Sequence, residues 1–321
     1  MNNEKNRMDL NNSFRKTQKS VNKKKHTCLY PNCSNIAVSS HSQQRNRSLK
    51  SISRDNHVYT LNADLGHSYK FKNDEFNISF KLTGIGEVST FNGFCNDHEN
   101  LFEIFEQNGL DVHDQRAVSY LHYRTLMYGY SKIRREIERI EFDKEQSIKT
   151  FQNINTESIL TEILQMRNIE LINFKNQSDI VIQHIENDNK DFLSFLTVEL
   201  SENIGVSSSG NSMLNNDNKN SPIFSFNILP DENSTIIIIT WLRIYDNQAK
   251  WLVELFNKDL ELLINLIAFY LTEDISISPD LWESNDEIEK VVISIEHLID
   301  PLFFQENKIK RVLKLYNSTN I

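Results

Sequence analysis

TFNGFCNDHENLFEIFE, residues 90–106, combines half of a candidate metal site with the start of a helix. Cys95 and His98 lie three residues apart, and the polar residues between them are suited to capping a helix. Apolar side chains then recur at helical spacing and define one face to be buried. The stretch therefore predicts a strand, a metal half-site and a helix over residues 100–109, in that order.

The remaining two cysteines complete a set of four candidate zinc ligands. CLYPNC places Cys28 and Cys33 five residues apart, with a proline and an asparagine between them to shape a knuckle. Thiolate sulfur and imidazole nitrogen are the donors that Zn²⁺ prefers, and a full Cys3His set is typical of a structural site. We therefore expect structural Zn²⁺ bound by Cys28, Cys33, Cys95 and His98. The alternative is that these are ordinary buried cysteines and a solvent-exposed histidine.

Composition favours a folded, mainly helical protein with few turns. The chain has 321 residues, which suggests two domains or one domain with an elaborated N-terminus. It contains only 8 glycines and 5 prolines, and this scarcity favours long helices over a fold of many strands. The net charge of −9 argues against a protein coated in nucleic acid, although a local basic patch remains compatible with it.

Nothing in the sequence indicates a membrane or a secretory route. No apolar run reaches the roughly 20 residues that span a bilayer. Residues 1–25 are rich in Asn, Lys and Arg, lack the apolar core of a signal peptide, and are predicted to form a disordered basic tail. Three cysteines, an odd number, suit a reducing compartment and a metal site better than a disulfide framework. We expect a cytoplasmic protein without a membrane partner.

The hydrophobic pattern predicts an α+β fold in which a zinc-binding unit, residues 26–110, precedes a larger helical body, residues 111–321. On the long helix that opens this body, Tyr123 and Arg124 are predicted to be buried packing and ion-pair residues. Composition predicts a flexible loop over residues 207–222. Helices are expected near 111–149, 156–188, 246–272 and 285–299. Two strands are expected at 57–61 and 76–82. Three more strands, near 192–200, 223–229 and 234–244, are expected to form a short antiparallel sheet.

SSHSQQRNRSLKSI, residues 39–52, follows the knuckle and places a histidine before the second half-site. Knuckle, histidine, hairpin and half-site leading into a helix together resemble the zinc-stabilised HNH, or His-Me finger, nucleases. The resemblance covers residues 27–106 and implies a treble-clef-like ββα unit. It also implies that His41 is the general base, and that Asn100 is the nearest helical ligand for a catalytic Mg²⁺ or Mn²⁺.

The chain departs from the HNH pattern at positions that matter for catalysis. Ser40 stands where the family usually has an acidic residue, and no clean Asn–x–x–His set follows on the helix. Glu99 or Glu103 could substitute for Asn100 as the helical ligand. These departures weaken the prediction of catalysis more than the prediction of the fold. The alternative role of His41 is to form hydrogen bonds within the finger only.

A second resemblance covers most of the chain. Four segments occur in the order SHSQQ, STFNGFCNDHENLFEIFE, YLHYRTLMYGYSK and SISPDLWES. Their order resembles that of similar segments in a family of uncharacterised bacterial proteins with an N-terminal Cys/His zinc knuckle. In that family an aspartate usually follows the metal-site histidine, whereas this chain has Glu99. The resemblance implies no activity.

A basic cluster follows His41. It comprises Arg45, Arg47, Lys50 and Arg54, three of which would share one side of a helix. This could be a stripe that contacts phosphates, or a solvated face that offsets acidic neighbours.

Two functions are therefore predicted. One is a zinc-binding interaction or scaffold protein that docks nucleic acid or a protein, by analogy in a bacterial defence or conflict system. The other is a metal-dependent HNH-like nuclease that uses His41. The missing acid at position 40 favours the scaffold.

Overall fold

The computed structural model describes residues 20–21, 24–61, 70–72, 75–77, 80–150, 154–213, 220–272, 274–288 and 311–315. The basic tail predicted over residues 1–25 lies almost entirely outside these ranges, as does most of the helix predicted near 285–299. Among the described residues, no helix has both the length and the apolar character needed to cross a membrane.

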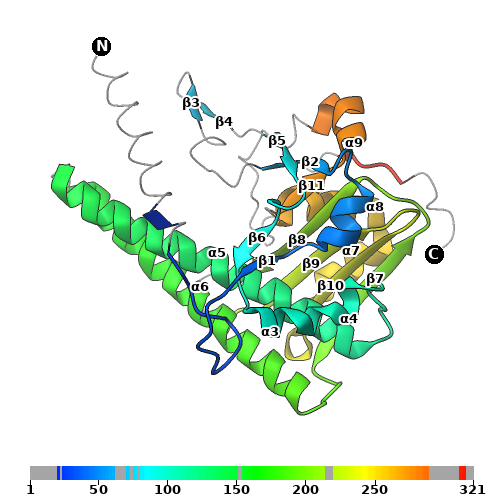
Figure 1. The fold of residues 1–321 in the computed structure, drawn as a ribbon, viewed down its shortest axis with the longest axis horizontal. Coiled ribbons are helices and arrows are strands. Elements are labelled where there is room, and N and C mark those ends of the chain that lie inside the picture. The colour runs from blue at the N-terminus through cyan, green and yellow to red at the C-terminus, as the bar shows by residue number, and fades with distance from the viewer. Residues whose placement is uncertain are drawn as a thin grey trace.

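One antiparallel sheet organises the described chain (Figure 1). Its strands are, in spatial order, β5 (Phe80–Gly84), β2 (His57–Leu61), β11 (Ile275–Ile277), β8 (Val206–Met213), β9 (Ile223–Pro230), β10 (Thr235–Leu242) and β7 (Leu193–Leu200). The α+β class is confirmed. The short sheet predicted near 192–244 is wrong, because the sheet has seven strands within the described residues.

Strand β8 accounts for part of this difference. Its sequence, VSSSGNSM, has small polar residues where an alternating apolar pattern would identify a strand, and it falls largely within the loop predicted over residues 207–222. In the fold, Ser207, Ser208 and Ser209 are fully buried in the sheet. Hydroxyls that have partners in a buried strand are compatible with a core position, so composition alone misassigns this segment.

Helices cover both faces of the sheet. On one face lie α7 (Lys250–Lys258), α8 (Leu260–Leu266) and the short π-helix η4 (Ile267–Leu271), packed on Phe224 and Phe226 of β9. The apolar helix predicted over residues 246–272 is thus broken at Asp259, whose side chain caps α8.

The opposite face carries two long helices that run side by side, α5 (Gln115–Thr150) and α6 (Ile154–Glu186) (Figure 1). They confirm the two long helices expected near 111–149 and 156–188. Side chains of α5 pack on Ile223 and Ile238, which lie on the sheet face opposite Phe224. The central strands are therefore buried on both sides, as their nearly continuous apolar sequence favours.

The unit predicted to bind zinc lies against α5. Its strands β1 (Ser39–His41) and β6 (Thr90–Asn92) pair antiparallel, and three short helical pieces follow. These are α3 (Asn96–Glu99), η2 (Asn100–Phe102) and α4 (Glu103–Glu106), where the sequence predicted one helix over residues 100–109.

The segment between β1 and β6 joins the main sheet. Within it, β2 pairs with β11 in the register Thr60↔Ser276, so the sheet crosses the boundary predicted at residue 110. The remaining short elements are η1 (Arg45–Leu49), the hairpin of β3 (Lys70–Lys72) and β4 (Glu75–Asn77), η3 (Arg243–Tyr245) and α9 (Pro279–Ser284).

Candidate functional site

Four side chains converge where the N-terminal knuckle meets the start of α3. The ligand atoms of Cys28, Cys33, Cys95 and His98 all lie within 4.8 Å of one another. The Sγ atoms of Cys33 and Cys95 are 3.9 Å apart, and His98 Nδ1 lies 3.4 Å from Cys28 Sγ and 3.3 Å from Cys95 Sγ. Among the described residues, this is the one group of three or more His, Cys, Asp or Glu side chains placed to hold a metal ion.

These distances fit a tetrahedral zinc ion. Zn–S bonds of about 2.3 Å and Zn–N bonds of about 2.0 Å require roughly 3.8 Å between two sulfur ligands and roughly 3.5 Å between sulfur and nitrogen. The three separations above agree with these edges to within a few tenths of an ångström. Three cysteines and one histidine are also the donor types of structural zinc sites. The cluster can therefore hold Zn²⁺ with all four positions filled by protein.

The knuckle is shaped by local backbone contacts. Asn32 adopts a positive φ of 59°, a conformation that asparagine tolerates better than most residues, and the Cys33 amide donates to the Tyr30 carbonyl at 3.2 Å. The amide of Leu29 donates to the Gly93 carbonyl at 2.8 Å and ties the two half-sites together. CLYPNC therefore bends back on itself and presents its two sulfurs to the same point.

The His98 ring is held in place by stacking. It lies on the ring of Tyr30, with the centroids 4.0 Å apart and the planes 8° from parallel. The Tyr30 hydroxyl in turn donates to Glu186 Oε1 of α6 at 2.7 Å. Tyr30 thus orients a metal ligand and also fixes the knuckle to the long helices.

The thiols differ in their pKa values because their surroundings differ. Burial raises the pKa of Cys28 to about 12. Burial also opposes ionisation of Cys95, but hydrogen bonds from the His98 amide and the Asn35 side chain, with smaller contributions, bring its pKa down to about 6. A Zn²⁺ ion between these sulfurs would hold both as thiolates, since a coordinated thiol loses its proton.

A second polar cluster begins one residue after the last zinc ligand. His41, Glu99 and Glu106 line a hollow of about 190 Å³, whose other lining residues are Gln44, Arg45 and Asn46. We call this the His41 hollow. His41 is half-buried, and its Nδ1 lies 3.0 Å from the Val88 carbonyl oxygen. Because a carbonyl can only accept, Nδ1 carries a proton, and Nε2 has the free lone pair when the ring is neutral.

Burial determines the ionisation of this cluster. It lowers the pKa of His41, which favours the neutral ring, and it raises the pKa of Glu99. Oε1 of Glu99 is buried and has no hydrogen-bond partner among the described residues. The hollow is thus lined by a neutral imidazole and a carboxylate of raised pKa.

The ion pair of Arg124 and Glu106 adjoins the hollow, because Glu106 is one of its lining residues. The Arg124 side chain is 1% exposed, and its guanidinium lies over the rings of Phe102 and Phe105. The burial and ion pairing predicted for Arg124 are confirmed, and Tyr123 is also buried. The pair fixes Glu106 at the edge of the hollow.

The helical residue beside His41 is Glu99, whereas Asn100 is exposed and does not line the hollow. Glu103 is exposed as well. The catalytic role predicted for Asn100 stays untested, and its position gives it no contact with the hollow.

Two of the four basic residues predicted to contact phosphates form ion pairs within the chain. Arg47 Nε donates to Asp231 at 2.9 Å, and Arg54 Nη1 donates to Asp280 at 3.0 Å and to Glu283 at 2.9 Å. Arg45 and Lys50 are exposed. Arg54 is exposed too, so what sets Arg45, at the rim of the His41 hollow, and Lys50 apart is that neither forms an ion pair among the described residues.

One buried carboxylate was not predicted. Asp274, just before β11, accepts hydrogen bonds from the hydroxyls of Ser42 and Ser89, the latter at 3.0 Å. Ser42 follows β1 and Ser89 precedes β6, so Asp274 anchors one end of this strand pair to the main sheet. Burial raises the pKa of Asp274 to about 6. The sequence separation of 185 or more between these partners left no local signal for the contact.

Comparison of the chain with protein-family models, with curated proteins and with solved structures finds no match. The two resemblances therefore rest on the motifs quoted for them, and the function must be argued from the site.

Proposed function

We propose that this protein is a zinc-stapled interaction protein. A structural Zn²⁺ on Cys28, Cys33, Cys95 and His98 would hold a treble-clef-like ββα unit in the shape that docks a partner. The observation that supports the proposal most is the closed ligand set, because four protein donors leave a tetrahedral zinc no open position for water or substrate. A role in a bacterial defence or conflict system would suit a protein of this type, by analogy alone.

Charge favours a protein partner over nucleic acid. Arg47 and Arg54 are already engaged by acidic residues, and the His41 hollow carries two carboxylates, which repel phosphate. The exposed side of α6 also carries large apolar side chains, among them Met166 at 46% and Ile172 at 40% exposure. Exposed apolar groups on a long helix are suited to contact with another protein.

A metal-dependent HNH-like nuclease is the second candidate, and the His41 hollow is the observation that favours it. A carbonyl bond to Nδ1 leaves Nε2 of a neutral His41 able to accept a proton, and Glu99, which lines the same hollow, offers a carboxylate to Mg²⁺ or Mn²⁺. Among the described residues, however, no third ligand converges there. A catalytic metal would then rely on water and substrate oxygens for most of its coordination.

Metal analysis combined with a cleavage assay separates the two functions. The full-length chain and the variants His41→Ala and His57→Ala would be analysed for zinc, then incubated with DNA and RNA in Mg²⁺ or Mn²⁺. His57 is the matched control, because its Nδ1 also contacts a backbone carbonyl but its side chain is exposed and remote from Glu99.

The interaction protein is expected to contain about one Zn²⁺ per chain, and all three proteins are expected to cleave equally little. Cleavage that is lost in His41→Ala and retained in His57→Ala, at unchanged zinc content, would establish the nuclease instead. A folded protein free of zinc would remove the basis of both functions.

A further inference from the structure

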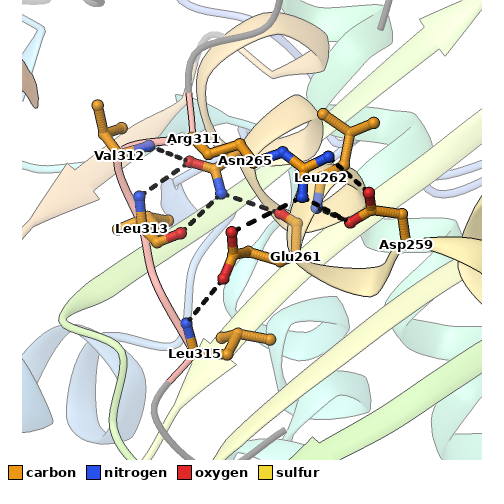
Figure 2. Close-up of polar contacts among 8 residues, drawn as sticks. All are labelled: Asp259, Glu261, Leu262, Asn265, Arg311, Val312, Leu313 and Leu315. Carbon is orange, nitrogen blue, oxygen red and sulfur yellow. Dashed lines mark hydrogen bonds and ion pairs between the residues drawn. The ribbon is translucent and has the colours of Figure 1, made fainter.

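Residues 311–315, which we call the strap, lie beside α8 (Figure 2). The strap contacts Asp259, Glu261, Asn265 and Asn285, and we call the surface formed by these four residues the groove. These groove residues belong to the body of the protein, whereas the strap is a short segment remote from them in sequence. The body therefore holds the strap through contacts to both its backbone and its side chains.

Asn265 reads the strap backbone. It is fully buried, and its Oδ1 accepts from the amides of Val312 and Leu313, both at 2.9 Å. Its Nδ2 donates to the Leu313 carbonyl at 2.9 Å and to the Glu261 carbonyl at 2.9 Å. Three of these four hydrogen bonds therefore go to the strap backbone, which bends at Leu313. A side-chain amide used in this way can recognise the backbone of a peptide chain.

Side-chain contacts add sequence preference. The Arg311 guanidinium binds Asp259 with two bonds, of 3.1 Å and 2.6 Å, and Glu261 lies 3.9 Å away (Figure 2). Leu313 is 4% exposed and belongs to the core cluster on this face of the sheet, and Leu315 packs against the same cluster. The groove thus favours a basic residue followed by leucines two and four positions later.

The groove residues also make contacts outside the strap. Asp259 accepts from the Leu262 amide as the N-terminal cap of α8, and α8 packs on the main sheet. A second peptide with the same pattern would meet the same acidic lip, buried amide and apolar floor. These are the requirements of a preformed recognition site.

We propose that this groove is a peptide-recognition site, and that the strap occupies it as an intramolecular ligand. The partner it fits is a protein with a segment of the pattern basic–x–Leu–x–Leu, which would displace the strap. The carboxylates of Asp259 and Glu261 select the basic residue, and Asn265 selects a backbone that bends as the strap does at Leu313. The site lies on α8, away from the zinc ligands, so its test is independent of the zinc-dependent function.

The test uses a fluorescent peptide of residues 309–317 and the full-length chain. Leu313→Asp in the chain should release the strap, because a carboxylate replaces a buried leucine, while Lys314→Asp is the matched control at an exposed position. The peptide is expected to bind the Leu313→Asp chain about tenfold or more tightly than the wild-type or Lys314→Asp chain, because the strap no longer competes.

Two peptide variants make the result independent of protein folding. A peptide with Leu313→Asp is expected to lose binding, and a peptide with Lys314→Asp to retain most of it. Circular dichroism would establish that each chain variant is folded. The proposal is overturned if the peptide fails to bind a folded Leu313→Asp chain, or if the two peptide variants bind equally well. Equal affinity of the peptide for all three chains would show that the strap does not compete for the groove, and would overturn that part of the proposal.

Discussion

Two consecutive residues, His98 and Glu99, belong to two polar clusters that differ in what is expected to hold them together. Around His98, four ligand atoms lie within 4.8 Å of one another and could hold a metal ion. Around Glu99, the neighbours are largely fixed by protein contacts, as His41 is by the Val88 carbonyl and Glu106 by Arg124. We therefore expect the stability of the first cluster to depend on metal and that of the second to depend on the packing of the chain.

Removing one candidate zinc ligand should produce the largest loss of stability. It tests whether the cluster around His98 depends on metal. His98→Asn deletes one of four donors, and zinc binding can contribute on the order of 10 kcal/mol to the folding of such a site. We expect the variant to lose zinc on dialysis against a weak chelator and to melt at a much lower temperature, measured by mass spectrometry and calorimetry.

His113→Asn is the matched control for this variant, because His113 is exposed and lies outside the cluster. It should keep the zinc content and melting temperature of the wild type. Equal zinc content in both variants would show that the cluster is not the metal site.

Breaking the ion pair behind the His41 hollow should produce the next largest effect. Glu106→Gln removes the partner of Arg124 and leaves a buried guanidinium without a counter-charge. Such a loss destabilises a protein by about 3 to 5 kcal/mol. Urea unfolding would measure it, with Glu103→Gln as the control on an exposed position of the same helix. Zinc content should stay unchanged in both, and a parallel loss of zinc would mean that the two clusters are coupled.

The two clusters were also predictable from the sequence to different degrees. The zinc ligands are recognisable because thiols and imidazole are rare and their spacing is local, as in CLYPNC and CNDH. The hollow is harder to predict, because residues 96–106 form three short helical pieces. A helical repeat of 3.6 residues cannot then show whether Glu99 or Asn100 faces His41.

A similar limit applies to the fold. The apolar strands β9 and β10 and the helices α5 and α6 follow from periodicity and composition. Strand β8 does not, because its serines carry no apolar alternation, and only the buried partners supplied by the fold make it a strand. Asp274 is hidden for the same reason, since its partners Ser42 and Ser89 are distant in sequence.

Asp274 gives the smallest and most specific test, because it accepts hydrogen bonds at one end of the β1–β6 strand pair. Its pKa in the folded state is about 6, above the ordinary value of 3.8, because burial outweighs the hydroxyl donors. The folded chain therefore binds the proton more tightly than the unfolded chain does. This contribution to stability is greatest below about pH 4, falls as the pH rises to about 6, and is lost above that.

Asp274→Asn should remove this dependence, because the amide stays neutral and can still accept from the serine hydroxyls. A shift of about two pKa units corresponds to roughly 3 kcal/mol across the interval. The free energy of unfolding in urea, measured from pH 4 to pH 7, should therefore fall with pH more steeply in the wild type than in Asp274→Asn. Asp280→Asn, with a side chain 84% exposed, is the control and should follow the wild type. Parallel profiles for wild type and Asp274→Asn would mean that Asp274 stays ionised in the fold. Charged contacts, rather than neutral hydrogen bonds, would then hold this end of the β1–β6 strand pair.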